Sequence, residues 1–266
     1  MMQIDAVLAA ELIAVAAELA DAARVATLKH FRSTGLKADT KESDRFDPVT
    51  VADRLSETEM RAILACRRPE DAIVGEEFGS KAGTSGLTWV LDPIDGTRSY
   101  LAGTPTWGVL IAVSDENGPI YGLIDQPYIG ERFEGGLGRA EVNGPMGRAV
   151  LKTRAPRPLS EAILFSTFPE VGKPEEGAAF RKVAARAKLV RYGTDCYAYG
   201  LIAAGQIDLV IEAGLQAYDV QGPIAVIEAA GGIVTDWQGR PCPMGGQVLA
   251  AANQDIHAEA MALLNS

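Results

Sequence analysis

The chain has 266 residues, a formal net charge of −10, three cysteines and two histidines. Its length allows a large hydrophobic core in one domain or two lobes, while its acidity argues against a nucleic-acid-binding surface. The widely spaced cysteines match no zinc pattern, the N-terminus lacks a basic signal region and no apolar run reaches the roughly 20 residues of a membrane span, so we expect a cytoplasmic protein with reduced thiols and no membrane partner.

The first elements are two helices joined by a polar segment. Apolar residues at helical spacing predict a long amphipathic helix over residues 4–31, followed by a mobile loop over 37–46. The sequence Asp-Pro-Val-Thr-Val-Ala-Asp, residues 47–53, then leads into a second helix over 54–64. Thr50 and Asp53 are alternative N-cap residues for that helix.

Two short apolar runs, each expected to be a strand, end in carboxylates. The run over residues 71–79 delivers Glu76 into a glycine-bounded loop. The run that begins at residue 89 ends in Asp92 and Asp95, which we expect to converge just beyond the strand end.

The turn after this second strand combines acids with a potential anion site. Pro93 stiffens the backbone between the two acids, and Gly96 allows close approach of a ligand. A helix that begins near Thr97 would offer unpaired backbone N–H groups to a phosphate. The alternative is an ordinary polar turn in which Asp95 caps the helix.

The remaining chain is predicted to form antiparallel strands and then a second lobe. The antiparallel strands are predicted over residues 106–112, 120–125 and 132–135. A segment rich in proline and arginine, residues 154–158, marks the boundary between lobes 1–153 and 154–266. The second lobe is predicted to alternate strands (162–165, 189–192 and 207–212) with helices (178–188 and 196–204). A last apolar helix starts near Asp219 and stops at Gly231-Gly232.

Four segments therefore bring a carboxylate to an element end flanked by small residues. Each acid alone reads more simply as a helix cap or a solvated side chain. Together, and beside a phosphate-binding turn, they require a hard divalent cation such as Mg²⁺ between acids and anion. The two histidines, His30 and His257, lie outside these motifs, and Cys196 has no evident base, so histidine- or cysteine-based catalysis is not expected.

The pattern resembles the inositol monophosphatase superfamily of lithium-sensitive, Mg²⁺-dependent phosphatases. The matching segments are residues 47–53, 75–77, 92–97, 218–219 and 228–232. The chain departs from the family at Tyr218, where many members have Trp, and at Gln221-Gly222-Pro223, where small apolar residues are usual. Neither departure removes a ligand. The resemblance implies an α/β (α+β) fold, the layered α/β/α/β sandwich, and a homodimer.

The resemblance also assigns roles to residues. It implies two or three Mg²⁺ ions, with Asp92 bridging two of them; the metal ligands are Glu76, Asp92, the carbonyl of Ile94, Asp95 and Asp219. It implies that Asp47 and Thr97 orient the attacking water, with Glu76 as a further catalytic residue, and that the segment Asp95-Gly96-Thr97 holds the phosphate.

The leaving alcohol is expected to contact the second lobe. The stretches 191–200 and 208–219, with 96–100 and 122–127, look most like histidinol-phosphate phosphatases of this superfamily. Asp195 and Glu212 are candidates to bind the ammonium and imidazole of that small-molecule ester, although Asp195 is equally suited to cap a helix. Arg98 is placed to reach either the phosphate or solvent.

Other functions remain open at this point. Within the superfamily they are hydrolysis of inositol 1-phosphate, fructose 1,6-bisphosphate or a 3′-phosphoadenosine nucleotide. Outside it, the fold could serve as a non-catalytic interaction module, but the complete set of acids argues against that reading.

Overall fold

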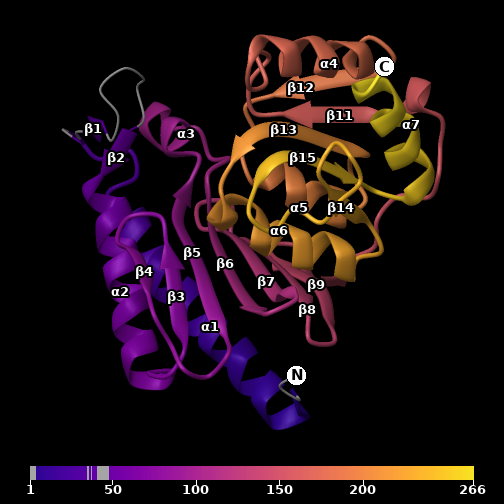
Figure 1. Cartoon of the computed structure of the whole chain (residues 1–266). Coiled ribbons are helices and arrows are strands. Elements are labelled where there is room, and N and C mark those ends of the chain that lie inside the picture. Colours follow the sequence, from indigo (N-terminus) through magenta and orange to yellow (C-terminus); the bar gives the residue numbers. More distant parts are fainter. Residues whose placement is uncertain (1–3, 35, 37, 41–47) are drawn as a thin grey trace.

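Helices and sheets alternate in layers through the structure, which is a computed structural model that describes residues 4–34, 36, 38–40 and 48–266. Helices α1 (Ala6–Leu28) and α2 (Val51–Arg67) cover one face of a large sheet (Figure 1). Helices α5 (Tyr197–Ala203) and α6 (Ala217–Ala229) lie between this sheet and a smaller one. This order matches the layered α/β sandwich that the sequence predicts.

The large sheet has eight strands in the order β10-β9-β8-β7-β6-β5-β3-β4. Most neighbours are antiparallel, but β3 and β5 run parallel, so their carboxyl ends lie at the same edge. The strands are β3 (Ala72–Gly75), β4 (Gly79–Lys81), β5 (Thr88–Asp95), β6 (Gly108–Asp115), β7 (Gly118–Gln126), β8 (Glu131–Gly136), β9 (Arg139–Gly144) and β10 (Gly147–Val150).

The small sheet has five strands in the order β12-β11-β13-β15-β14. They are β11 (Ile163–Ser166), β12 (Leu189–Tyr192), β13 (Leu209–Leu215), β14 (Ile233–Thr235) and β15 (Gly246–Ala251). Helices α4 (Pro174–Ala184) and α7 (Gln254–Leu264) cover its outer face. The shorter elements are β1 (Ala38–Thr40) paired with β2 (Pro48–Thr50), helix α3 (Thr97–Ala102) and a 3₁₀ turn (Leu159–Glu161).

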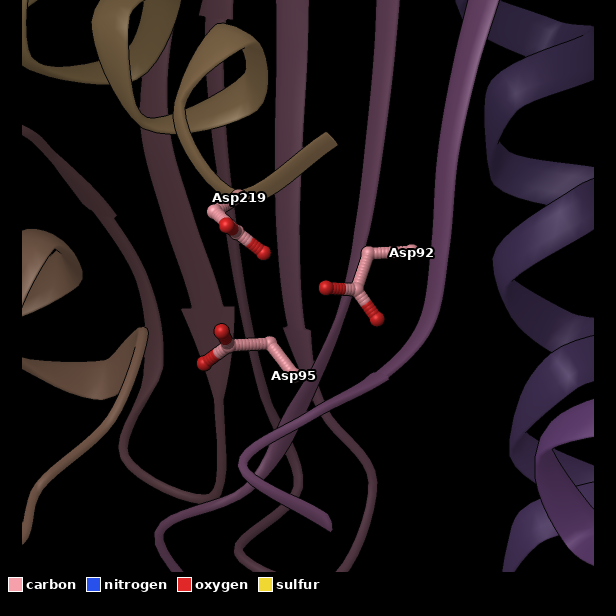
Figure 2. Close-up of side chains that lie close together, drawn as sticks. All are labelled: Asp92, Asp95 and Asp219. Atoms are coloured by element: carbon pink, nitrogen blue, oxygen red, sulfur yellow. The ribbon is translucent and has the colours of Figure 1, made fainter. Parts of the chain in front are cut away.

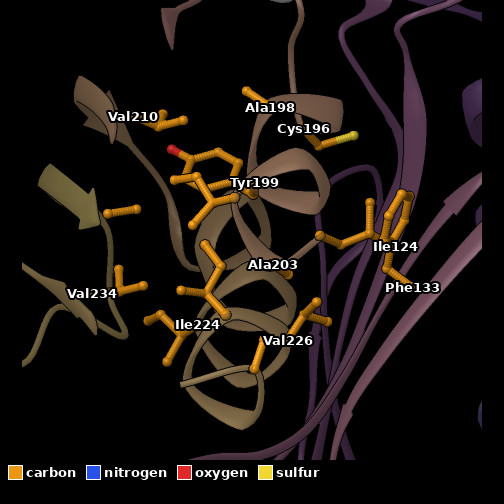
Figure 3. Packing of buried hydrophobic residues seen from close by; sticks show 14 of the residues in the cluster. Ile124, Phe133, Cys196, Ala198, Tyr199, Ala203, Val210, Ile224, Val226 and Val234 are labelled. Atoms are coloured by element: carbon orange, nitrogen blue, oxygen red, sulfur yellow. The ribbon is translucent and has the colours of Figure 1, made fainter. Parts of the chain in front are cut away.

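Buried apolar residues fill the spaces between these layers. One cluster joins α1 and α2 to the large sheet, and another joins the small sheet to α4 and α7. The central cluster lies around α5 and α6 and includes side chains of both sheets, among them Phe133 and Val210 (Figure 3). Because α6 packs on both sides, its position is fixed relative to both sheets.

The connection between the sheets contains residues 154–158, where the sequence places a lobe boundary. Helix α6 follows this segment in the chain and yet packs against β6, β7 and β8 of the large sheet. The division into lobes 1–153 and 154–266 stays a prediction. Within the part of the chain that the structure describes, no helix is both long and apolar enough to cross a bilayer.

Candidate active site

Three aspartates from two distant segments meet at the end of strand β5. Asp92 and Asp95 lie on β5, and Asp219 lies in the first turn of α6 (Figure 2). One carboxylate oxygen of each lies within 4.8 Å of the others. The sequence predicts all three as metal ligands, and the fold brings them together although Asp92 and Asp219 are 127 positions apart in the chain.

The two acids of β5 converge because the strand is irregular where it carries them. Its register with β6 shifts between Asp92 and Asp95, around Pro93, which has no N–H for a strand ladder. The backbone N–H of Ile94 donates to Asp92 Oδ1 at 3.0 Å. The bulge therefore turns side chains three residues apart toward one point.

Asp95 does not cap the following helix, contrary to the simpler alternative. Gly96 occupies the N-cap position of α3 with φ of 86° and without a side-chain bond, a conformation that suits glycine. Asp95 Oδ2 instead accepts a hydrogen bond of 2.6 Å from the backbone N–H of Cys196. This bond ties the end of β5 to the start of α5.

Asp219 is held by the way in which α6 begins and packs. Its Oδ2 accepts a bond of 2.6 Å from the backbone N–H of Gln216, the N-cap residue. Farther along, α6 approaches β7 so closely that a Cβ on Gly122 would lie 2.2 Å from the carbonyl oxygen of Gly222. The unusual Gln221 is buried and donates to the carbonyl of Pro243 at 2.9 Å.

Crowding of negative charge dominates the electrostatics of this cluster. Burial and then the charge of Glu76, with those of Asp95 and Asp219, raise the pKa of Asp92 well above its usual value. Burial, followed by the charges of Asp195 and Asp219, raises the pKa of Asp95 to about 8. Buried carboxylates at such separations are stabilised by cations, and an all-oxygen donor set fits a hard divalent ion.

Glu76 lies in a turn after β3 that is supported by a buried glutamate of α2. Glu57, which is 0% exposed, accepts hydrogen bonds from the backbone N–H groups of Glu77 at 2.7 Å and Phe78 at 3.2 Å. Arg61 donates to the same carboxylate at 2.7 Å. Glu57 was not predicted, although its position four residues after Asp53 places both acids on one face of α2.

Thr97 pairs with an acid that the sequence treats only as a helix cap. Thr97 Oγ1 lies 3.3 Å from Asp53 Oδ1 and 3.2 Å from the carbonyl oxygen of Ile94. Asp53 also accepts bonds from the N–H (2.8 Å) and hydroxyl (2.6 Å) of Thr50, which is the N-cap of α2. Asp47, predicted as the partner of Thr97, lies outside the described residues.

On the side of the second lobe, Glu212 and Asp195 face the same site. Glu212 lies on β13, and its Oε1 accepts bonds from the N–H (2.6 Å) and hydroxyl (2.9 Å) of Thr167. Burial raises the pKa of Glu212 to about 8. Glu212 is also one of the residues that line the cleft described below.

Asp195 does not cap α5, because Cys196 takes that position. Its backbone is left-handed, with φ of 46°, and its carboxylate accepts a bond of 2.8 Å from the hydroxyl of Thr106. A Cβ on Gly96 would lie 2.6 Å from Asp195 Cγ, so the glycine at the phosphate-binding turn also allows this acid to approach.

One cleft of about 860 Å³ joins these groups. Its lining includes every predicted site residue except Asp47: Glu76, Asp92, Ile94, Asp95, Gly96, Thr97, Arg98, Asp195, Glu212 and Asp219. The metal-type ligands and the acids predicted to bind the alcohol therefore line the same cleft. Such an arrangement suits an ester of a phosphate with a small alcohol.

Comparison with known proteins gives concordant matches. The model of the inositol monophosphatase family matches residues 8–266. The bifunctional phosphatase IMPL2 of Arabidopsis thaliana chloroplasts is 41% identical over 93% of this chain and 73% of its own length. The histidinol-phosphatase of Streptomyces coelicolor is 36% identical over 93% of this chain and 94% of its own. An inositol monophosphatase structure from Zymomonas mobilis covers 96% of this chain and 97% of its own at 38% identity, with a TM-score of 0.84.

Proposed function

The chain belongs to the inositol monophosphatase family and is a phosphoric monoester hydrolase, and we propose that it uses Mg²⁺ to hydrolyse L-histidinol phosphate to L-histidinol in histidine biosynthesis. The similarity to histidinol-phosphatases supports this substrate, and so does the acidic alcohol side of the cleft. The similarity to inositol monophosphatases makes inositol 1-phosphate the competing substrate.

The metal ligands in this proposal are Asp92, Asp95 and Asp219, with Glu76 and the carbonyl of Ile94 at the same cleft. Asp92 lies among the other acids and would help to hold the cations. Bound divalent cations would supply Lewis-acid chemistry, lowering the pKa of water and neutralising charge on the phosphoryl oxygens. The backbone N–H groups of Gly96 and Thr97, which open helix α3 and have no acceptor within it, would bind phosphate oxygens.

In the same proposal, Asp53 and Thr97 orient the attacking water. Thr97 Oγ1 faces the cleft and lies 3.3 Å from Asp53 Oδ1, so the carboxylate can accept the hydroxyl proton while the threonine oxygen accepts a proton from water. Asp53 is 1% exposed and is fixed by Thr50, which limits its rotation. Such fixed alignment is worth more to the rate of attack than basicity alone.

Recognition of the alcohol depends on charge. Once the acids assigned to metals are set aside, the cleft is still lined by Asp195, Glu212, Glu170 and Glu176, and the first two are the acids predicted to bind the alcohol. Each of these two already accepts hydrogen bonds from threonines, which hold the carboxylates in place. An ammonium or imidazolium donates charge-assisted hydrogen bonds to such groups, whereas inositol offers only neutral hydroxyls.

The observation that carries the substrate proposal is the buried Glu212, and its replacement tests it. We compare kcat/KM for L-histidinol phosphate and inositol 1-phosphate in the wild-type enzyme and in Glu212→Gln. We expect the wild type to prefer the cationic ester and the variant to lose about tenfold in kcat/KM for that ester alone, because a hydrogen bond to a charged group is replaced by a neutral one. A wild-type preference for inositol 1-phosphate would reject the substrate and leave the phosphatase mechanism in place.

A further inference from the structure

An aromatic ring and a guanidinium face each other at the cleft that holds the candidate site. Arg98 belongs to α3, directly after Thr97, and Phe168 follows β11 on the opposite side. Arg98 Cζ lies 5.0 Å from the centroid of the Phe168 ring, within cation–π range. Both residues line the cleft, and Phe168 is 43% exposed, so part of its ring is accessible.

The position of Phe168 is coupled to that of Glu212. The preceding residue, Thr167, donates both its N–H and its hydroxyl to Glu212 Oε1. The ring is therefore attached, through one residue, to the acid that we assign to the substrate cation. A cation held by Glu212 would have an aromatic face available from the neighbouring residue of the same loop.

The charged residues that line the cleft are mostly acidic, which favours a cationic ligand, and an aromatic ring can bind the same cation. The described lining residues that carry positive charge are Arg98 and Lys173, and acids outnumber them. Of the remaining acids on this side, Glu176 accepts bonds from the Lys173 N–H at 2.7 Å and from Gln247 at 2.9 Å, so both of its oxygens have partners. The Phe168 ring is the aromatic group of the lining, and in the structure it already binds a cation, that of Arg98.

We propose that Phe168 is a specificity-determining residue whose ring, which lies beside the Arg98 guanidinium, receives the cationic end of the substrate alcohol. This inference rests on the proposed function and names a contact that the acids alone do not supply. On binding, the substrate cation takes the ring face, and Arg98 moves from the ring toward the phosphate oxygens. The ring would then exchange one cation–π contact for another.

The test measures kcat and KM for L-histidinol phosphate and for inositol 1-phosphate in wild type, Phe168→Leu and Phe168→Tyr. Leucine keeps the apolar bulk and removes the π face, so we expect KM for histidinol phosphate to rise about fivefold, with kcat unchanged. Phe168→Tyr keeps the π face, so we expect its KM for histidinol phosphate to equal that of the wild type. For inositol 1-phosphate, we expect kcat and KM of both variants to stay within about twofold of the wild-type values.

A matched control removes a similar ring elsewhere. Tyr128 is 49% exposed and lies under Arg32, with 4.5 Å between Cζ and the ring centroid, but it does not line the cleft. Tyr128→Leu should leave both KM values unchanged. An equal change for both esters in Phe168→Leu, or no change for histidinol phosphate, would overturn the inference.

Binding of the free product separates this inference from the proposed function. Calorimetry with L-histidinol in the presence of Mg²⁺ should give a weaker affinity for Phe168→Leu than for wild type, whether or not an ester is hydrolysed. Equal affinities would again count against Phe168. Absence of turnover with both esters in the wild type would contradict the proposed function alone.

Discussion

In the proposed mechanism, Thr97 and Asp53 orient the water that attacks the bound phosphate. The distance of 3.3 Å between their oxygens and the nearby carbonyl of Ile94 give the threonine hydroxyl two acceptors at the edge of the cleft. Asp53 is also part of the capping box of α2, so the same carboxylate supports the helix and the site. The capping box therefore holds the Asp53 carboxylate in a fixed position beside Thr97.

Replacement of Thr97 by alanine should reduce kcat while leaving KM and the Mg²⁺ requirement nearly unchanged. The expected loss in kcat is about 100-fold, because proton transfer and water alignment contribute on this scale. Thr97→Ser keeps the hydroxyl and should retain most of the activity. Steady-state kinetics would contradict this role if alanine and serine gave the same kcat.

Individual residues of the site differ in how far the sequence predicts them. Asp92, Asp95 and Asp219 follow from a specific motif and a helix start, and the structure brings them together. The sequence predicted Asp53 only as a helix cap. Its approach to Thr97 depends on how α2 packs against β5, which the sequence does not show. The neighbouring Asp47 stays a prediction. The capping roles considered for Asp95 and Asp195 are wrong, because Gly96 and Cys196 occupy those positions.

At the scale of elements, helix α2 supports the site at two places. Asp53 lies in its first turn, and Glu57, one turn later, accepts the backbone N–H groups of the turn that carries Glu76. A Cβ on Gly75 would lie 2.0 Å from Glu57 Oε1, so a larger residue there would displace the Glu57 carboxylate. A change in this contact should therefore affect metal binding without touching a ligand.

Glu57→Gln should weaken Mg²⁺ binding by about tenfold, as expected for a residue that orients a ligand from behind. In the wild type, both oxygens of Glu57 accept backbone N–H groups. The side-chain NH2 of glutamine would face one of these N–H groups as a second donor, and the turn that carries Glu76 would shift. The measurement is the Mg²⁺ concentration that gives half-maximal phosphate release. Glu59→Gln makes the same change at an exposed position of α2 and serves as the control; equal Mg²⁺ requirements in both variants would disprove the coupling.

Elements with a clear apolar period were predicted well, and others were not. The long first helix is α1, two residues shorter at its start and three at its end than residues 4–31. The helix predicted over 178–188 begins earlier, because Pro174 takes the first helical position and Glu175 and Glu176 follow it. Strands β9, β10, β14 and β15 and helix α7 were not predicted. Strand β10 is exposed throughout and lacks a buried face, so its residues show no alternation.

For the whole molecule, the acidic cluster links folding stability to pH and metal. The folded-state pKa of Asp95 and that of Glu212 are about 8, above those of the unfolded chain. Their protonated forms therefore stabilise the metal-free fold fully below about pH 4, and this contribution is lost as the pH rises through 8. Mg²⁺ would replace the protons at the ligands and remove much of this dependence.

Metal-free protein should accordingly lose stability as the pH rises from about 5 to 8, by up to about 1.4 kcal/mol per pH unit for each proton that only the folded state retains, and the slope should vanish above about pH 9. Urea unfolding in EDTA and in Mg²⁺ measures this slope. Asp95→Asn should flatten it in EDTA. The same slope in both solutions would show that the metal does not occupy the acid cluster.

The homodimer and the cytoplasmic location stay predictions, and light scattering would decide the former. The layered fold was predicted through the family resemblance and is confirmed by the structure and its relatives. Composition and periodicity alone would not have given the order of the layers. That order arises because α6 packs against the large sheet, although it follows three strands of the small sheet in the chain.

The most direct test of the account is release of phosphate from L-histidinol phosphate by the wild type and by Asp92→Asn, each with Mg²⁺ and with EDTA. We predict turnover only for the wild type with Mg²⁺, because the asparagine keeps the shape of Asp92 and removes a negative charge that would hold the cations. Folding of the variant is verified by its unfolding curve in EDTA. Turnover that persists in Asp92→Asn, or in the wild type after complete removal of metal, would contradict the proposed mechanism.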